Sequence, residues 1–126
     1  ELGLYEDPYQ YFGMLSAEMH RAIRLVVDTG IHTKGWSREK AIEYSLENEA
    51  ESEASIISEI ERYMANPGQA LSYKIGQLKI LQLRKKAENE LGENFNIKIF
   101  HRKVLESGCI PLELLEDKID RWINSF

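Results

Sequence analysis

Apolar residues recur at intervals of three and four along most of this chain, a spacing that is typical of amphipathic helices. The first such segment opens with Asp7 and Pro8, an N-cap followed by a proline at the first helical position. Gly30 supplies the kind of C-terminal stop that helices commonly use. We therefore expect a long first helix that ends at Gly30. Its inward residues are expected to be Phe12, Leu15, Met19, Ala22, Ile23 and Val26.

Five further helices follow from the same periodicity and from capping and stop residues. Ser37 and Ser52 can cap two of them, and Gly92 and Gly108 can end two others. No segment alternates with the period of two that a half-buried strand shows. The pattern predicts an all-α protein, a compact array of about six helices with short connections. The later helices are expected over residues 38–48, 53–65, 67–91 and 95–107 and from residue 111 onward.

The stretch from Arg62 to Gly76 contains residues that are unfavourable in the interior of a helix. Asn66 can cap a helix and Pro67 suits its first position, but Gly68 and Gly76 each weaken a helix by about 1 kcal/mol relative to alanine. At about 100° per residue, apolar residues cover two sides of the first half of this fourth helix. We expect that half to be buried, with its N-terminal end deepest.

The N-terminus of the fourth helix is a candidate binding site. Its unpaired amides attract anions, and Gly68 has no side chain to keep a carboxylate or an oxyanion away from them. Gln69 and Tyr73 lie one turn apart on one face, where both can hydrogen-bond a polar ligand. The alternative stays open that Tyr73 is a core tyrosine and that Gly76 marks a close crossing of two helices.

Asp28 and His32 are a second unusual feature. Asp28 is expected at the C-terminus of the first helix, where the helix dipole disfavours a carboxylate, so we expect it to have a partner. His32 is expected on the following loop, where it could act as a hydrogen-bond donor or a proton carrier. A surface histidine without a special role is the alternative.

Composition narrows the classes of function. A net charge of −5 over 126 residues argues against non-specific binding to nucleic acid, and no apolar run approaches the roughly 18 residues that a membrane span needs. The length predicts a single helical domain over residues 1–126. His20, His32 and His101 are far apart, so we expect no metal site within the chain. Because the chain starts at Glu1 without an initiator methionine or a signal-like segment, it reads as a fragment of a longer protein.

Seven short motifs follow one another along the chain. They are YEDPY (5–9), VVDTGIH (26–32), KGWSRE (34–39), RY (62–63), PGQALSYKIG (67–76), FH (100–101) and PL (111–112). Taken together they resemble a bacterial family, the domain of unknown function family 885. The likeness covers nearly the whole chain, and the ordered series is much more specific than any one motif.

Members of that family look like zinc-dependent peptidases of the gluzincin type. In such enzymes an HExxH helix supplies two histidine ligands and the general-base glutamate, and a later glutamate supplies the third ligand. The resemblance implies that this chain matches the C-terminal part of such a catalytic domain and that those motifs lie upstream of Glu1. It therefore implies zinc for the full-length protein, no cofactor in this chain, and no hydrolysis by this chain alone.

The resemblance also implies that four side chains face the metal cleft: His32, Tyr63, Gln69 and Tyr73. Tyr73 or Tyr63 would donate a hydrogen bond to the oxyanion that develops during hydrolysis, because zinc enzymes use such donors beside the metal. His32 would be a second donor or a contact to the substrate. These assignments come from the resemblance and not from helical spacing.

Two functions are compatible with the sequence. The first is the C-terminal substrate-binding part of a zinc-dependent peptidase or hydrolase, in which Arg62 or the amides around Gly68 could hold the carboxylate of a peptide-like substrate. The second is a non-catalytic helical interaction module. The hydrolase hypothesis predicts that the face of Gln69, Tyr73 and Gly76 is exposed in this chain. The missing N-terminal part of the protein would pack against this face, or the isolated chain would self-associate through it. Peptide-degrading enzymes of this kind are often exported, which favours a periplasmic or exported location.

Overall fold

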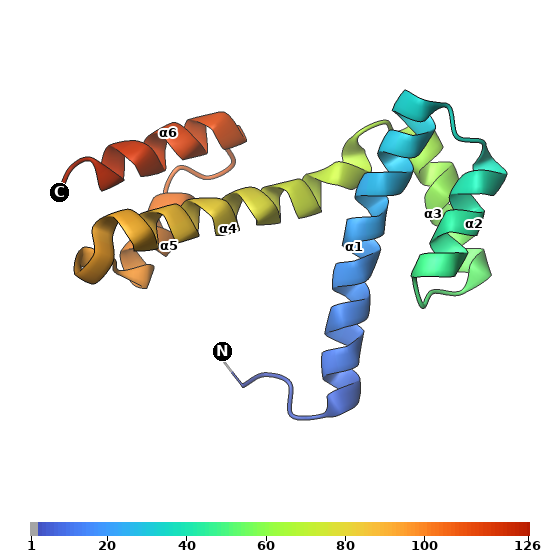
Figure 1. Ribbon diagram of the computed structural model, residues 1–126, viewed down its shortest axis with the longest axis horizontal. Helices are drawn as coiled ribbons and strands as arrows, with labels where there is room; N and C mark the ends of the chain where they lie inside the picture. Colours follow the sequence, from blue (N-terminus) through green and yellow to red (C-terminus); the bar gives the residue numbers. More distant parts are fainter. Residues whose placement is uncertain (1–2) are drawn as a thin grey trace. The chain divides into compact units, whose positions relative to one another are not determined.

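The computed structural model describes residues 3–126, and all the regular structure in this part of the chain is helical (Figure 1). The predicted all-α class is therefore confirmed. None of the helices in the described part is both long and apolar enough to cross a membrane. The α-helices are α1 (Pro8–Lys34), α2 (Arg38–Asn48), α3 (Glu53–Ala65), α4 (Ser72–Leu91), α5 (Ile97–Leu105) and α6 (Leu112–Ile123), and the short 3₁₀ helices are η1 (Gln69–Leu71) and η2 (Gly92–Asn94).

The chain divides into two compact units, Glu1–Lys74 and Ile75–Phe126, and the boundary falls within α4. Each unit has its own hydrophobic core. In the first unit, the C-terminal half of α1 packs against α2, α3 and η1. That core consists of Ile23, Val27, Ala41, Ile56, Ile60, Tyr63 and Ala70.

Three predicted N-caps of the first unit are present. The Asp7 carboxylate accepts the Tyr9 N–H at 2.8 Å. Ser37 and Ser52 each accept an N–H three residues further on, at 3.2 and 3.3 Å. Each cap satisfies an amide that the helix itself leaves unpaired, which is worth about 1 kcal/mol.

The first helix does not end at Gly30, as the sequence suggested, but continues to Lys34. The stop is Gly35, whose φ of +64° places it in the left-handed region that favours glycine. Gly30 has another reason to be glycine, because a Cβ atom there would lie 2.5 Å from Cδ2 of Trp36. Gly30 is a packing position and Gly35 is the helix stop.

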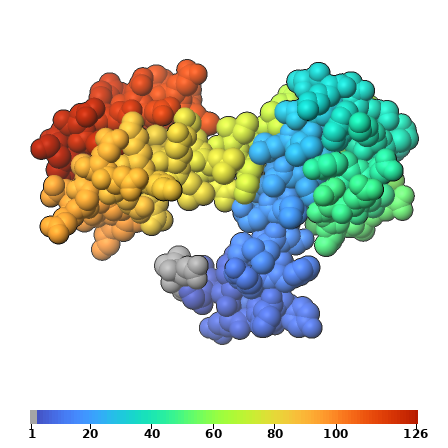
Figure 2. Space-filling model, viewed as in Figure 1, coloured from blue at the N-terminus to red at the C-terminus, as the bar shows by residue number. Residues whose placement is uncertain are grey.

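The face of α1 that we expected to be inward is largely exposed. Phe12, Leu15, Met19 and Val26, which we call the α1 stripe, have exposed fractions between 38 and 61%. In Figure 2 the first turns of α1 extend beyond α2 and α3, shown in green. Of the residues predicted to face inward, Ile23 is buried as expected, and it is joined by Arg24, Val27, Asp28 and Gly30.

The expectation for the fourth helix also needs correction. Asn66 ends α3 and does not begin a new helix, and Gly68 has a φ of +79° in the turn that leads into η1. The burial is the reverse of what we expected: Leu83, Ala87 and Leu91 are buried in the C-terminal half of α4. Tyr73, Ile75 and Leu78, nearer the N-terminus, are exposed.

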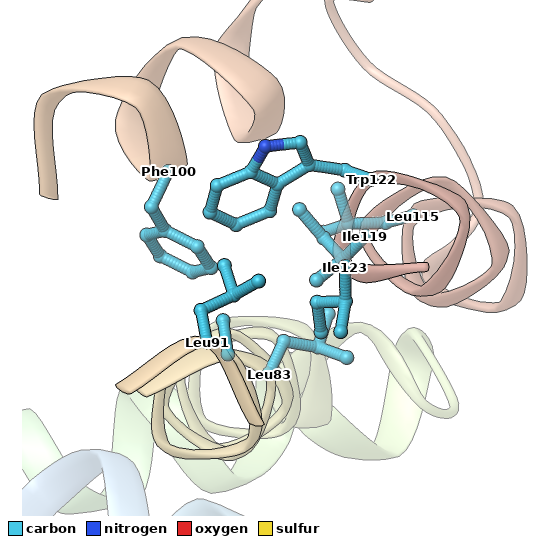
Figure 3. Packing of buried hydrophobic residues seen from close by; sticks show 8 residues of the cluster. Leu83, Leu91, Phe100, Leu115, Ile119, Trp122 and Ile123 are labelled. Atoms are coloured by element: carbon cyan, nitrogen blue, oxygen red, sulfur yellow. The ribbon is translucent and has the colours of Figure 1, made fainter. Parts of the chain in front are cut away.

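The second unit packs α4, α5 and α6 around aromatic residues. The ring centroids of Phe100 and Trp122 lie 6.5 Å apart, and Figure 3 shows both rings converging with Leu83 and Leu91. The fifth helix begins later than predicted because the side chain of Asn96 caps it, accepting the N–H groups of Lys98 and Ile99, and it ends at Leu105. This core is made of Leu83, Ala87, Leu91, Phe100, Leu115, Ile119, Trp122 and Ile123.

Candidate functional site

A buried carboxylate holds the turn between α3 and η1. The Gly68 N–H lies 3.1 Å from each oxygen of Asp28, whose exposed fraction is only 2%. Asp28 thus has the partner that we expected, although it lies inside α1 and not at the helix end. The anion at the Gly68 amide is therefore a side chain of this same chain, and it ties the turn to α1.

His32 provides a second tie between the same elements. It lies in the last turn of α1, not on a loop, and its Nε2 donates to the backbone carbonyl of Tyr63 at 2.9 Å. That carbonyl also accepts the Asn66 N–H at 3.2 Å. His32 therefore stabilises the C-terminal end of α3, where carbonyl groups lack partners within the helix.

Glu59 organises the residues on the last turns of α3. Its carboxylate accepts Arg62 Nη2 at 2.6 Å, Arg62 Nε at 3.0 Å and the Tyr63 hydroxyl at 2.8 Å. The hydrogen bonds from Arg62, the largest influence, lower the pKa of Glu59 to about 2. Burial, followed by the bond to Glu59, raises the pKa of Tyr63. The hydroxyl hydrogen of Tyr63 is thus held within the chain.

Arg24 joins this network to η1 and α4. Its guanidinium carbon lies 5.5 Å from the ring centroid of Tyr63 and 5.6 Å from that of Tyr73, within cation–π distance of both. Its Nη2 is 3.4 Å from Oε1 of Gln69, an oxygen that also accepts Arg62 Nη1 at 2.6 Å. Arg24 is 8% exposed, and within the described residues its Nε has no hydrogen-bond partner.

A pocket of about 300 Å³ opens beside Arg24. Arg21 lies 5.9 Å from the Tyr73 ring, and neither Arg21 nor Arg24 forms an ion pair with any carboxylate among residues 3–126. Tyr73 is 61% exposed. The pocket therefore presents two cations without a paired acid, in a chain whose net charge is negative. Its lining residues are Ala17, His20, Arg21, Arg24, Glu51 and Tyr73.

His20 lies at the edge of this pocket and is paired. Its Nδ1 is 2.5 Å from Oε2 of Glu49, and its Nε2 is 3.9 Å from Oε2 of Glu59. The hydrogen bond with Glu49 raises the pKa of His20 above its ordinary value. This pair links α1 to the connection between α2 and α3.

The sequence-predicted residues are thus brought together, but mostly through residues that sequence reasoning missed. Arg24 and Glu59 make most of the connections, and neither stood out in the sequence. One signal could have found Arg24: His20, Arg24 and Asp28 follow one another at intervals of four, so they share one helical face. The predicted residues are His32 on α1, Arg62 and Tyr63 on α3, Gly68 and Gln69 at η1 and Tyr73 on α4.

Comparisons with known proteins place the chain in a family. The family "Bacterial protein of unknown function (DUF885)" matches residues 1–119. The chain is also similar to the crystal structure of a "putative lipoprotein" from Colwellia psychrerythraea, with a TM-score of 0.95 and 49% sequence identity, over 99% of this chain and 22% of that one. This chain therefore spans about a fifth of the length of the Colwellia protein. No curated protein matched. The chain belongs to the DUF885 family of bacterial proteins.

Proposed function

We propose that this chain is the substrate-binding part of a peptidase-like hydrolase. The observation that carries the proposal is the pocket in which the exposed ring of Tyr73 lies against the guanidinium of Arg24. Such a pocket offers a hydroxyl donor and fixed positive charge to the polar groups of a peptide-like substrate. The chain is expected to bind substrate and not to hydrolyse it alone.

The two candidate tyrosines have different roles in this proposal. The hydroxyl of Tyr63 donates to Glu59, so Tyr63 acts as a positioning residue for Arg24. The hydroxyl of Tyr73 has no hydrogen-bond partner among residues 3–126, which leaves it free to donate to a substrate or a developing oxyanion. The Nε2 of His32 donates to the backbone carbonyl of Tyr63, and its Nδ1 is proposed to contact the substrate.

We propose zinc only for the longer protein and not for this chain. Within residues 3–126, no group of three or more histidine, cysteine, aspartate or glutamate side chains is arranged to hold a metal ion. The described residues therefore do not fit a zinc centre. The metal ligands and the general base of the proposed hydrolase would lie in other parts of the longer chain.

The α1 stripe is proposed to pack against the remainder of that longer protein. Phe12, Leu15 and Met19 are exposed and also line a pocket of about 240 Å³ beside the connection between α2 and α3. Large exposed apolar surfaces typically mark contacts with other protein segments. The Colwellia protein has nearly four-fifths of its length outside the matched part, which offers enough chain to cover such a face.

A non-catalytic helical interaction module is the second candidate, because the same exposed α1 stripe would also suit a partner protein. An HExxH sequence followed by a glutamate motif upstream favours the hydrolase. The absence of that motif from the longer gene favours the interaction module.

The kinetic test uses the longer DUF885 protein and a peptide substrate. Tyr73→Phe should lower kcat/KM by about a hundredfold, because loss of one oxyanion donor costs roughly 3 kcal/mol. Tyr9→Phe is the matched control, since Tyr9 is an exposed tyrosine on α1 that does not line the pocket. Equal kcat/KM values for the two variants would count against Tyr73 as a donor. A longer protein that hydrolyses no peptide would overturn the proposal itself.

We also propose that the protein works outside the cytoplasm. Support comes from the description of the Colwellia relative as a lipoprotein, which is a class of exported protein. Fractionation of bacteria that produce the native longer protein tests this. Recovery with the periplasmic or envelope fraction is expected, and recovery with the cytoplasm contradicts it.

A further inference from the structure

The guanidinium of Arg24 is buried without full compensation. It has an exposed fraction of 8%, its Nε has no partner within the described residues, and its one hydrogen bond is the 3.4 Å contact to Gln69. A buried charge is costly unless it is paired and hydrogen-bonded. The flanking rings of Tyr63 and Tyr73 offset part of that cost. The rings do not replace the hydrogen bonds that the guanidinium N–H groups donate in the plane of the group.

The acceptors near Arg24 are already engaged. Oε1 of Gln69 accepts a 2.6 Å bond from Arg62, and the Glu59 carboxylate accepts bonds from Arg62 and Tyr63. Glu49 is paired with His20. The remaining acid of the pocket is Glu51, which is exposed and forms no ion pair with any basic group in the described residues. Within the described residues, the guanidinium of Arg24 therefore keeps donor capacity that no acceptor uses, and it lines a pocket in which a bound ligand can accept from it.

We propose that this pocket binds the C-terminal carboxylate of a peptide, with Arg24 and Arg21 as the cationic donors and the Tyr73 hydroxyl as the neutral donor. A carboxylate is planar and accepts two parallel N–H bonds from a guanidinium. The pocket volume of about 300 Å³ is at the small end of the range for ligand sites, which suits one terminal residue and not a long segment. The peptide nature of the ligand rests on the proposed function.

Glu51 lines the same pocket as the two arginines and lowers its net positive charge. The expected preference for a peptide carboxylate over inorganic phosphate rests on shape, because a carboxylate is flat and matches the guanidinium with two parallel hydrogen bonds. The rest of the terminal residue adds contacts with the pocket that phosphate lacks.

The test is a titration of the 126-residue chain, followed by NMR, with N-acetyl-alanyl-alanine and with the carboxamide of the same dipeptide. The free acid should bind at least tenfold more tightly than the amide, because only the acid forms charged hydrogen bonds with the arginines. Inorganic phosphate should bind more weakly than the free acid. Tighter phosphate binding, equal affinities for acid and amide, or no binding of the acid would each overturn the inference.

Arginine variants test whether the free acid binds in this pocket. Arg24→Gln should weaken binding of the acid at least tenfold, and Arg24→Lys should weaken it less, because the charge remains without the planar donors. Arg21→Gln, at a half-buried position, gives a second test if Arg24→Gln does not fold. Arg102→Gln, on the exposed face of α5, is the matched control. Unchanged affinity in folded Arg24→Gln or Arg21→Gln, as judged by circular dichroism, overturns the assignment.

These results separate the inference from the proposed function. If acid and amide bind equally and Tyr73→Phe still lowers kcat/KM in the longer protein, the pocket binds a substrate but does not recognise its terminus. If the acid binds through Arg24 and the longer protein hydrolyses no peptide, the carboxylate site stands and the hydrolase proposal does not.

Discussion

Replacement of Asp28 by asparagine tests how the site is held together. Asp28 is 2% exposed, and both of its oxygens lie 3.1 Å from the Gly68 N–H. Asparagine has nearly the same shape, but it is uncharged and presents an NH₂ group in place of one oxygen. Hydrogen bonds to charged groups contribute about 1.5–3 kcal/mol, so Asp28→Asn should lower the unfolding free energy of the first unit by about 2 kcal/mol.

Two tryptophans allow the effect to be followed in each unit. Trp36 lies in the first unit and Trp122 in the second, and the chain has no other tryptophan. For a unit of this size, 1 kcal/mol shifts the melting temperature by about 4–8 °C, so about 2 kcal/mol should shift it by about 8–16 °C. The indole N–H signals in a thermal NMR series measure both midpoints.

The reasoning requires a local effect. The Trp36 midpoint should fall in Asp28→Asn, and the Trp122 midpoint should change much less. Asp117→Asn, at an exposed position on α6, is the control and should leave both midpoints in place. An unchanged Trp36 midpoint would refute the claim that the Asp28–Gly68 contact stabilises the turn.

Three further outcomes follow from the structure. Gly30→Ala should destabilise the first unit by about 1–3 kcal/mol in a thermal melt, because the new Cβ meets Trp36, whereas Gly13→Ala meets open space and should stabilise α1 by up to about 1 kcal/mol. Glu59, with a pKa lowered to about 2 from 4.5, contributes stability that is complete above pH 4.5 and lost as the pH falls toward 2. After screening by solvent this amounts to about 1 kcal/mol, and acid unfolding of Glu59→Gln should show a correspondingly weaker pH dependence. The isolated chain should self-associate through the α1 stripe in light scattering, and Leu15→Glu should make it monomeric; a monomeric parent chain would contradict this.

The sequence predicted the helical class and most helix starts because these depend on local signals. Ser37 and Ser52 lie next to the amides that they cap, so a few residues contain the whole interaction. Helix ends were harder to predict. Gly30 and Gly35 are equally plausible stops in sequence. Only the fold distinguishes them, because Gly35 adopts a left-handed φ of +64° and Gly30 packs against Trp36.

Burial of α1 could not be predicted from periodicity alone. The α1 stripe has the spacing of a core-facing helix, but the first unit packs its other face, with Arg24 and Asp28 among the buried residues. Periodicity shows that a face is apolar, and it does not show which segment covers that face. For the same reason the exposed N-terminal half of α4 was expected to be buried.

The candidate site was predicted in part. Gly68 stood out because glycine is unfavourable in a helix, although its role is a left-handed turn that donates to Asp28. Arg24 did not stand out, because its position depends on the rings of Tyr63 and Tyr73, which lie about 40 and 50 residues further along the chain. Contacts at such separations follow from the fold and not from local sequence.

The most direct test of the account is the effect of Arg24→Gln on the longer DUF885 protein with two matched peptide substrates, one ending in a free carboxylate and the other in a carboxamide. The account predicts that kcat/KM for the free acid falls at least tenfold, to about the value for the amide, while kcat/KM for the amide stays unchanged. An equal fall for both substrates, or no fall for the free acid, would contradict recognition of the substrate's terminal carboxylate by Arg24.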